Sequence, residues 1–248
     1  MRIIGIIPSR FASSRFPGKP LVDIKGKSMI QRVYEQASKS TLLNYLIVAT
    51  DDTLIFDHVK KFGGNAIMTS SDIQNGTERC FETIKLLKNS TDSKEFDIVI
   101  NIQGDEPFIN PLIIDKLAFV FNNQKVQIAT LIKKIGSEEE LFNPNVVKVV
   151  IDHLKKAVYF SRQAIPFIRN KNEQEWIHHY LFYKHIGIYG YTIQTLEEIN
   201  SFNKSSLEKA ESLEQLRWIE NGKTIHTEIT EYDSIGIDTP EDLLKINL

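Results

Sequence analysis

Residues 3–20 read IIGIIPSRFASSRFPGKP. The apolar run 3–7 predicts a buried β-strand, and the small residues and prolines after it predict a loop. That loop carries three cations, Arg10, Arg15 and Lys19. In an open α/β sheet, ligands bind at the loops that follow the carboxyl ends of the strands. The stretch therefore predicts a site for a ligand with several negative charges, and a nucleoside triphosphate is the candidate that we infer.

Strand and helix patterns alternate along the first half of the chain, which favours βαβ units and an α/β fold with a mainly parallel sheet and flanking helices. The expected strands are 2–7, 45–49, 66–68, 96–102, 128–135, 146–151, 157–161, 185–191 and 225–228. The expected helices are 29–39, 53–62, 77–88, 111–122, 138–142, 193–201, 206–220 and 240–246. Residues 169–175 are expected to form a loop.

We interpret residues 1–248 as one domain with a smaller lobe roughly within 126–190. Between 126 and 161 the expected elements are mostly strands, so the lobe has a mixed or antiparallel character. It is one candidate for an oligomer surface.

The composition is ordinary for a globular protein, since 42% of the 248 residues are hydrophobic and 25% are charged. The net charge of −2 gives no basic field for nucleic acid. Cys80 is the one cysteine, so no intramolecular disulfide is possible, which fits a cytoplasmic protein. The N-terminal apolar run is too short for a signal peptide, and no stretch approaches the roughly 20 apolar residues of a membrane span. We therefore expect no membrane insertion.

Two aspartates follow apolar runs, Asp105 after the strand expected at 96–102 and Asp238 after Ile235-Gly236-Ile237. Mg²⁺ binds one or two carboxylates together with phosphate oxygens, so these two side chains are candidates to share a metal ion. The simpler interpretation of each is a solvated loop aspartate. The residues that follow Asp238, Thr239-Pro240, are explained by helix initiation alone.

Other positions carry weaker signals. Gly76-Thr77 opens an expected helix, where free backbone amides can bind an anion. Thr50 follows an expected strand and is either a ligand contact or part of a helix cap. His185 and Tyr189 share one face of an expected strand, where a structural role is the commoner one.

The chain as a whole resembles the 3-deoxy-manno-octulosonate cytidylyltransferases, or CMP-Kdo synthetases. Motifs in order along nearly the whole chain carry the resemblance. They are IPSR and RFPGKPL in residues 7–21, VATD at 48–51, GTER at 76–79, NIQGDEP at 101–107, FNPNVVKVV at 142–150, YFSR at 159–162, HIGIYGY at 185–191, LEQLR at 213–217 and DTPED at 238–242.

The resemblance implies a Rossmann-like fold, a homodimer, and transfer of CMP from CTP to the anomeric hydroxyl of Kdo for lipopolysaccharide synthesis. It implies that the triphosphate is held by Arg10, Arg15 and Lys19, and that Asp105 and Asp238 bind Mg²⁺; these five are the catalytic candidates. The remaining nucleotide contacts that it implies are Thr50, Gly76, Thr77 and Arg79. The sugar contacts that it implies are Gln103, Arg162, His185, Tyr189, Glu214 and Gln215.

The sequence departs from the family pattern at Ser9, Ser28 and Lys184, which leaves an amino-substituted Kdo analogue open as the sugar. A cytidylyltransferase for sialic acid is a second alternative, although such enzymes usually have a more glycine-rich first loop. A nucleotide-binding regulator without turnover is a third, and the pair Asp105 and Asp238 argues against it. A nicotinamide dehydrogenase is disfavoured because no G-x-G-x-x-G follows the first strand.

Overall fold

The computed structural model describes residues 1–12, 16–89, 95–233 and 236–245. Contacts divide the chain into two compact units. Unit 1 consists of the described residues within 1–119, 190–200 and 234–248. Unit 2 consists of residues 120–189 and 201–233. Apart from Gly190, the lobe expected at 126–190 lies in unit 2, which also includes residues 201–233.

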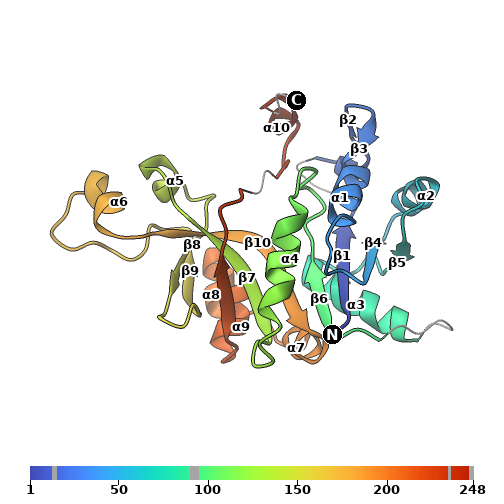
Figure 1. Cartoon of the computed structure of the whole chain (residues 1–248). Helices are drawn as coiled ribbons and strands as arrows, with labels where there is room; N and C mark the ends of the chain where they lie inside the picture. Colours follow the sequence, from blue (N-terminus) through green and yellow to red (C-terminus); the bar gives the residue numbers. More distant parts are fainter. Residues whose placement is uncertain (13–15, 90–94, 234–235, 246–248) are drawn as a thin grey trace. The chain divides into compact units, whose positions relative to one another are not determined.

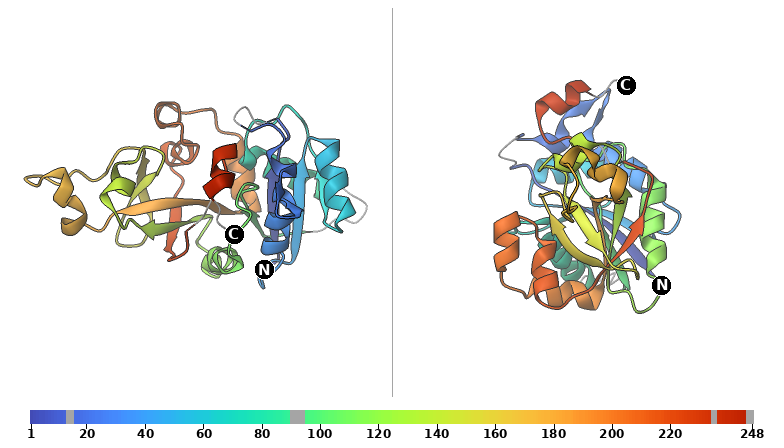
Figure 2. Two further views of the ribbon diagram at one scale, coloured as in Figure 1. Left: turned by 90° about the horizontal axis from the view of Figure 1, so that it is seen from above. Right: turned by 90° about the vertical axis from the view of Figure 1, so that its left-hand side faces the viewer.

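Unit 1 is built on a sheet with the strand order β6-β1-β4-β5 (Figure 1). Strand β1 pairs in parallel with β4 on one side and β6 on the other, so Ile6 lies opposite both Ile47 and Asn101. The paired strands lie side by side in the further views of Figure 2. Ile4, Ile6 and Ile7 are completely buried, as a central parallel strand requires. The strands of this sheet are β1 (Ile3–Ser9), β4 (Tyr45–Thr50), β5 (Ala66–Met68) and β6 (Ile98–Asn101).

Three helices of unit 1 begin at side-chain caps that the sequence supplies. Ser28 accepts a hydrogen bond from the amide of Gln31, Asp52 accepts from Leu54 and Ile55, and Asn75 accepts from Glu78. The helices are the 3₁₀ helix η1 (Lys19–Leu21), α1 (Met29–Ala37), α2 (Thr53–Lys61), α3 (Gly76–Lys88), α4 (Pro111–Val120), α7 (Ile193–Asn200) and α10 (Pro240–Lys245).

The order of the strands creates a crevice at one edge of this sheet. From β1 the chain proceeds to β4 and β5, and then returns to β6 on the other side of β1. Because β1 and β6 are parallel, the loops after both strands leave the same edge of the sheet. The loop with Lys19 and the loop with Asp105 therefore begin at this point.

Unit 2 combines parallel and antiparallel pairing. Strand β11 runs parallel to β7, with Ile225 opposite Ile128, and β8 pairs antiparallel with both β9 and β10. Its strands are β7 (Ile128–Lys134), β8 (Lys148–Ile151), β9 (Ala157–Ser161), β10 (Tyr183–Thr192, which continues into unit 1) and β11 (Ile225–Ile229). Its helices are α5 (Glu138–Phe142), the 3₁₀ helix η2 (Glu173–Glu175), α6 (Trp176–His179), α8 (Ser206–Glu211) and α9 (Gln215–Glu220).

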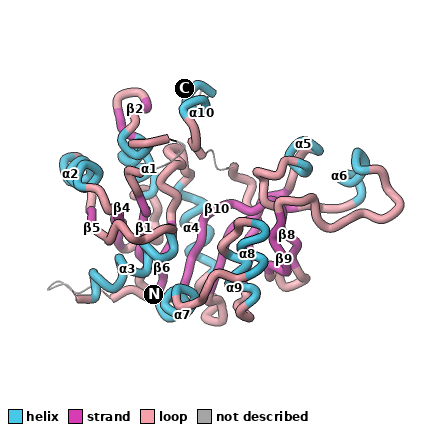
Figure 3. The backbone as a smooth tube through the Cα atoms, turned by 180° about the vertical axis from the view of Figure 1, so that it is seen from behind, coloured by secondary structure: helices cyan, strands magenta, loops and turns pink. Residues whose placement is uncertain are grey.

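The prediction of one helix over 206–220 is wrong, because α8 and α9 are separate segments (Figure 3). Ser212 has a φ of 54°, in the left-handed region that ends a helix. The reversal lets the guanidinium of Arg217 on α9 donate to both carboxylate oxygens of Glu208 on α8, at 2.7 and 2.5 Å. This buried ion pair holds α8 and α9 together across the turn at Ser212.

Every strand expected from the sequence is present, with ends shifted by a few residues. The hairpin of β2 (Asp23–Ile24) and β3 (Lys27–Ser28) was not predicted, and its turn places Lys25 and Gly26 at positive φ. The expected loop 169–175 contains η2. Among the helices of the described residues, none combines the length and the apolar character needed to cross a bilayer.

Candidate active site

Lys19, the first residue of η1, contacts the loop after β6 and the segment before α10. Its ammonium donates to Oδ2 of Asp105 at 2.7 Å, to Oδ1 of Asp238 at 3.3 Å and to the carbonyl of Ile237 at 2.9 Å. Gly18 precedes η1 with a φ of 71°, and its amide donates to the carbonyl of Phe11, which closes the loop. The structure therefore places Lys19, Asp105 and Asp238 in one cluster within unit 1.

The segment with Asp238 is held by backbone and side-chain contacts. The amide of Ile237 donates to the carbonyl of Asp105 at 2.9 Å, and the Ile237 side chain is buried with Ile24 and Met29. Asp242 accepts hydrogen bonds from the amides of Asp238 and Thr239, in the manner of a capping box. The helix-start pattern around Thr239 thus also fixes the backbone of Asp238.

The two carboxylates suit a hard cation. Their side chains remain 29% and 48% exposed for Asp105 and Asp238, while the Lys19 side chain between them is 14% exposed. The ammonium is a monovalent cation that both carboxylates already share. The described residues contain no group of three or more His, Cys, Asp or Glu side chains placed to hold a metal ion. A divalent ion here would complete its shell with phosphate oxygens and water, which is how Mg²⁺ usually binds.

A small cavity of about 150 Å³ opens beside the ends of β1 and β6 and the start of α3. Arg10 is exposed and contributes to its wall. A Cβ atom at Gly76 would lie 3.3 Å from Nδ2 of Asn101 and 3.5 Å from Cγ of Pro8, so glycine keeps this space open. The lining residues are Pro8, Arg10, Asn75, Gly76, Arg79, Asn101 and Gln103.

Gly104 brings the two loops of the crevice close together. A Cβ atom at this position would lie 2.8 Å from the backbone carbonyl oxygen of Pro8, closer than real Cβ contacts. Any other residue would push the loop after β6 away from the end of β1. The glycine of the Gln103-Gly104-Asp105 motif therefore helps to set the position of Asp105.

Arg79 contributes to the cavity wall but is anchored by the protein. Its side chain is 1% exposed, and the guanidinium donates to Asp51 at 3.0 Å and to Thr69 at 2.5 Å. It also donates to the carbonyls of Ser70 and Ile73. These bonds tie the end of β4 and the loop after β5 to α3, which is a structural role that the sequence alone does not predict.

The other expected nucleotide contacts lie near this edge of the sheet. Thr50 ends β4, is completely buried, and its hydroxyl accepts a hydrogen bond from the amide of Asp52 at 3.2 Å. Thr77 is buried in the first turn of α3, next to Gly76. Arg15 lies outside the described residues.

Of the expected sugar contacts, Gln103 lies in unit 1 and the other five lie in unit 2. His185 and Tyr189 are neighbours on β10, with ring centroids 5.1 Å apart. Burial raises the pKa of the Tyr189 hydroxyl well above its ordinary value, and the negative charge of Glu214 raises it further. The structure therefore brings His185, Tyr189 and Glu214 together.

Arg162 is held by backbone groups. Its Nε donates to the carbonyl of Glu211 at 2.8 Å, and Nη1 donates to the carbonyl of Pro144 at 3.1 Å. The loop before β8 is fixed in turn by Lys148, whose buried ammonium donates to the carbonyls of Asn143 and Val146. The bonds to Glu211 and Pro144 fix the orientation of the Arg162 guanidinium. Gln215, another of the expected sugar contacts, is buried at the start of α9.

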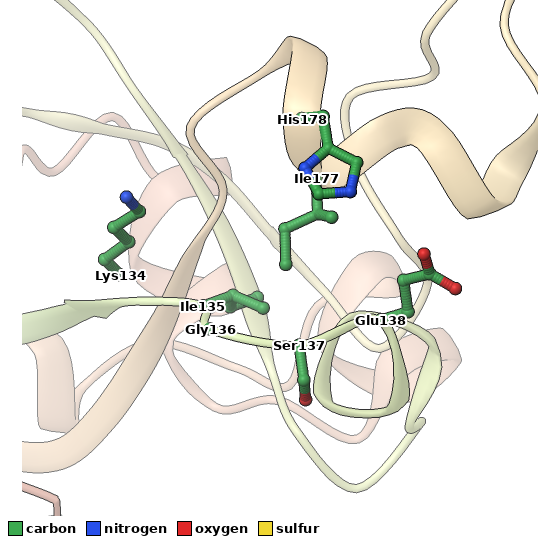
Figure 4. Close-up of a pocket in the computed structure, with 7 residues that line it drawn as sticks. All are labelled: Lys134, Ile135, Gly136, Ser137, Glu138, Ile177 and His178. Carbon is green, nitrogen blue, oxygen red and sulfur yellow. The ribbon is translucent and has the colours of Figure 1, made fainter.

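A second cavity, of about 500 Å³, lies in unit 2 (Figure 4). Glu138, the first residue of α5, and His178 on α6 lie on its wall, and no expected site residue lines it. Three further residues, to which the sequence assigned no role, are Asn75 and Asn101, which line the first cavity, and Thr130, which bonds His185. Asn101 is the first residue of the NIQGDEP motif and Asn75 directly precedes the GTER motif, whereas Thr130 lies in a strand without a motif.

Three comparisons with known proteins agree. A family model described as cytidylyltransferase matches residues 4–225. The 3-deoxy-manno-octulosonate cytidylyltransferase of Parabacteroides distasonis is 51% identical, over 99% of this chain and 96% of the relative, and that of Cytophaga hutchinsonii is 49% identical over 98% and 96%.

A solved structure of CMP:2-keto-3-deoxy-manno-octonic acid synthetase complexed with CTP superimposes with a TM-score of 0.90 at 40% identity, covering 99% of this chain and 97% of that one. A sequence identity of 40% over 99% of the chain indicates membership of the same family and not only a shared fold. The chain belongs to the 3-deoxy-manno-octulosonate cytidylyltransferase family.

Proposed function

We propose that the protein transfers CMP from CTP to the anomeric hydroxyl of Kdo and releases pyrophosphate. The observation that carries the proposal is the cluster of Lys19, Asp105 and Asp238 in a chain of this family. Two carboxylates that converge on one cation form the kind of site at which a polyphosphate and a second anion can be brought together. The product would serve lipopolysaccharide synthesis.

The nucleotide is assigned to the crevice of unit 1. Arg10 lines the cavity at the start of α3, where an exposed guanidinium can bind two phosphate oxygens. Lys19 supplies positive charge toward the departing pyrophosphate, which gains negative charge as the bond to the α-phosphorus breaks. Gly76 leaves room beside Asn101 for a part of the nucleotide.

Asp105 and Asp238 are proposed to hold Mg²⁺ through their carboxylate oxygens. When bound, the ion supplies positive charge that offsets the repulsion between the triphosphate and the sugar carboxylate, and it lowers the pKa of the attacking hydroxyl. The protein contributes the positions of the two carboxylates, which Ile237 and Asp242 fix through the backbone.

The sugar contacts are proposed to be Gln103, Arg162, His185, Tyr189, Glu214 and Gln215. Arg162 has N–H groups beyond the two that bond the backbone, and these are suited to a carboxylate. In-line attack of the hydroxyl on the α-phosphorus then depends mainly on positioning and on charge neutralisation. We also propose a cytoplasmic homodimer, in keeping with the family.

The test is a screen for pyrophosphate release. Purified protein is mixed with each of the four common ribonucleoside triphosphates and with Kdo, an amino-substituted Kdo analogue or sialic acid, with Mg²⁺ or with excess chelator. The expected result is release with CTP and Kdo only, abolished by the chelator and restored by Mg²⁺. Release with sialic acid but not with Kdo, or no release with any pair, would overturn the proposal.

A further inference from the structure

Thr130 on β7 occupies a position where three polar groups of β10 converge. Its Oγ1 lies 2.7 Å from the carbonyl of Ile188, 3.2 Å from the carbonyl of Ile186 and 3.0 Å from Nε2 of His185. Thr130 itself is completely buried, so water does not complete these interactions. All of these groups belong to unit 2.

The Thr130 hydroxyl has only one hydrogen to donate, and this determines which nitrogen of His185 is protonated. A threonine hydroxyl carries one hydrogen, and a carbonyl oxygen can only accept. The hydroxyl therefore gives its hydrogen to a carbonyl, the nearer being that of Ile188. Its oxygen then presents lone pairs to His185, and a favourable contact at 3.0 Å requires that Nε2 carry a hydrogen.

The surroundings hold the ring in this orientation. His185 packs edge-on against Phe160, with centroids 5.3 Å apart, and tilts against Tyr189 at 5.1 Å. The side chain of Thr130 also interacts with the Tyr189 hydroxyl. Burial lowers the pKa of His185 to about 3, which keeps the imidazole neutral near neutral pH and leaves one protonated and one bare nitrogen.

We propose that Thr130 is a positioning residue that fixes His185 as the Nε2–H tautomer, so that Nδ1 presents a lone pair and accepts a hydrogen bond from a hydroxyl group of the sugar. The second half of this inference rests on the proposed function. It assigns to His185 a contact with an O–H donor, since a bare nitrogen and an ionised carboxylate are both acceptors and repel one another. The carboxylate of the sugar would then be bound by cationic side chains such as that of Arg162.

The first test is a spectroscopic one on the free protein. Two-bond ¹H–¹⁵N correlation spectra of protein labelled with ¹⁵N-histidine distinguish the two tautomers, and the spectrum of His185→Gln assigns the signal. The expected result for the unmodified protein at pH 7 is protonated Nε2 and bare Nδ1. The Nδ1–H tautomer, or a doubly protonated ring, in the unmodified protein would overturn the inference.

Variants test the role of the hydroxyl. Thr130→Val keeps the shape and removes the hydroxyl, and we expect the His185 signal to shift toward the other tautomer or to a mixture. Thr130→Ser keeps the hydroxyl and should restore the original pattern. Thr227→Val is the matched control, because Thr227 is a buried threonine on β11 whose hydroxyl donates to the carbonyl of Lys155, and it should leave the pattern unchanged. An unchanged pattern in Thr130→Val would overturn the inference.

Kinetics test the link to the sugar. Thr130→Val should raise the KM for Kdo by about tenfold, the scale of one lost hydrogen bond, with little change in the KM for CTP, and Thr130→Ser should recover most of the loss. A tautomer change with no effect on the KM for Kdo would overturn the assignment of Nδ1 to a sugar hydroxyl. A tautomer change in a protein that shows no activity with Kdo would instead count against the proposed function, while the positioning role of Thr130 stands.

Discussion

The ammonium of Lys19 donates a 2.7 Å hydrogen bond to Asp105, a residue 86 positions further along the chain. The same group reaches Asp238 at 3.3 Å, so a single side chain compensates both carboxylates of the candidate metal site. A divalent ion that binds these carboxylates must compete with Lys19 for their oxygens. We therefore expect Lys19 to lower the affinity of the proposed site for a metal ion in the absence of nucleotide.

Lys19→Met should bind Mn²⁺ more tightly than the unmodified protein when nucleotide is absent. Removing the ammonium removes the competing charge, and we expect the dissociation constant to fall on the order of tenfold. Titration followed by the electron paramagnetic resonance of free Mn²⁺ measures this directly. Lys27→Met is the control, because Lys27 forms an exposed ion pair with Glu35. Equal affinity in Lys19→Met and the unmodified protein would contradict the expectation.

Asp105→Asn and Asp238→Asn should each lower kcat by roughly 10²–10⁴-fold, the scale found when an electrostatic stabiliser is removed. The fold should persist, since neither side chain is fully buried. Steady-state pyrophosphate release at saturating Mg²⁺ gives kcat, and circular dichroism checks the fold. Asp57→Asn on the exposed side of α2 should be neutral. Normal turnover in either variant would remove that aspartate from the site.

Gly76→Ala should impair the use of CTP. The new methyl group would lie 3.3 Å from the side chain of Asn101, at the wall of the small cavity. We expect the KM for CTP to rise by about tenfold, with little change in the KM for Kdo. Gly136→Ala, where a Cβ atom meets nothing within 4 Å, is the control. An unchanged KM for CTP would place the nucleotide away from this cavity.

Arg79→Met should lower the free energy of unfolding by about 3 kcal/mol, because it leaves Asp51 without its buried partner. Urea denaturation monitored by tryptophan fluorescence measures the change. The double variant Arg79→Met with Asp51→Asn should lose less stability than the sum of the two single variants, since the two residues are coupled. Additive losses would show that the ion pair contributes little and that Arg79 acts elsewhere.

Stability should depend on the protonation of His185. Burial lowers its pKa in the folded state to about 3, whereas the ordinary value is 6.5, so between these values the unfolded chain binds more protons than the folded one. The free energy of unfolding therefore falls as pH decreases through this window, by at most about 1.4 kcal/mol per pH unit for one proton. In His185→Gln that contribution is absent. Denaturation curves from pH 7 to pH 4 should show a shallower decline in the variant, and parallel declines would contradict the assignment.

Much of the fold could be predicted because its elements have clear patterns. The isoleucine run of β1 and the strand β6 are buried on both faces, and the helices begin at Ser28, Asp52 and Asn75, which are good capping residues. The split between α8 and α9 could not be predicted. It depends on a left-handed Ser212 and on the pairing of Glu208 with Arg217, neither of which has a local signature.

In the candidate site, too, some features could be predicted from the sequence and others could not. Asp105 and Asp238 stood out because each follows an apolar run, and the structure places both at Lys19. The anchoring of Arg79 depends on Asp51 and Thr69, which come from other loops, so only the folded chain reveals it. Thr130 is likewise a plain strand residue in the sequence, and its relation to His185 arises from the pairing of two strands.

The separation of 219 positions between Lys19 and Asp238 also has a consequence for biosynthesis. A ribosome completes Lys19 and Asp105 early, and then makes both segments of unit 2 before Asp238 emerges. Contacts between such distant positions form late, because a long loop must close first. A nascent chain therefore carries half of the proposed metal site throughout most of translation, and the capacity to hold the ion arises only when the C-terminal segment docks.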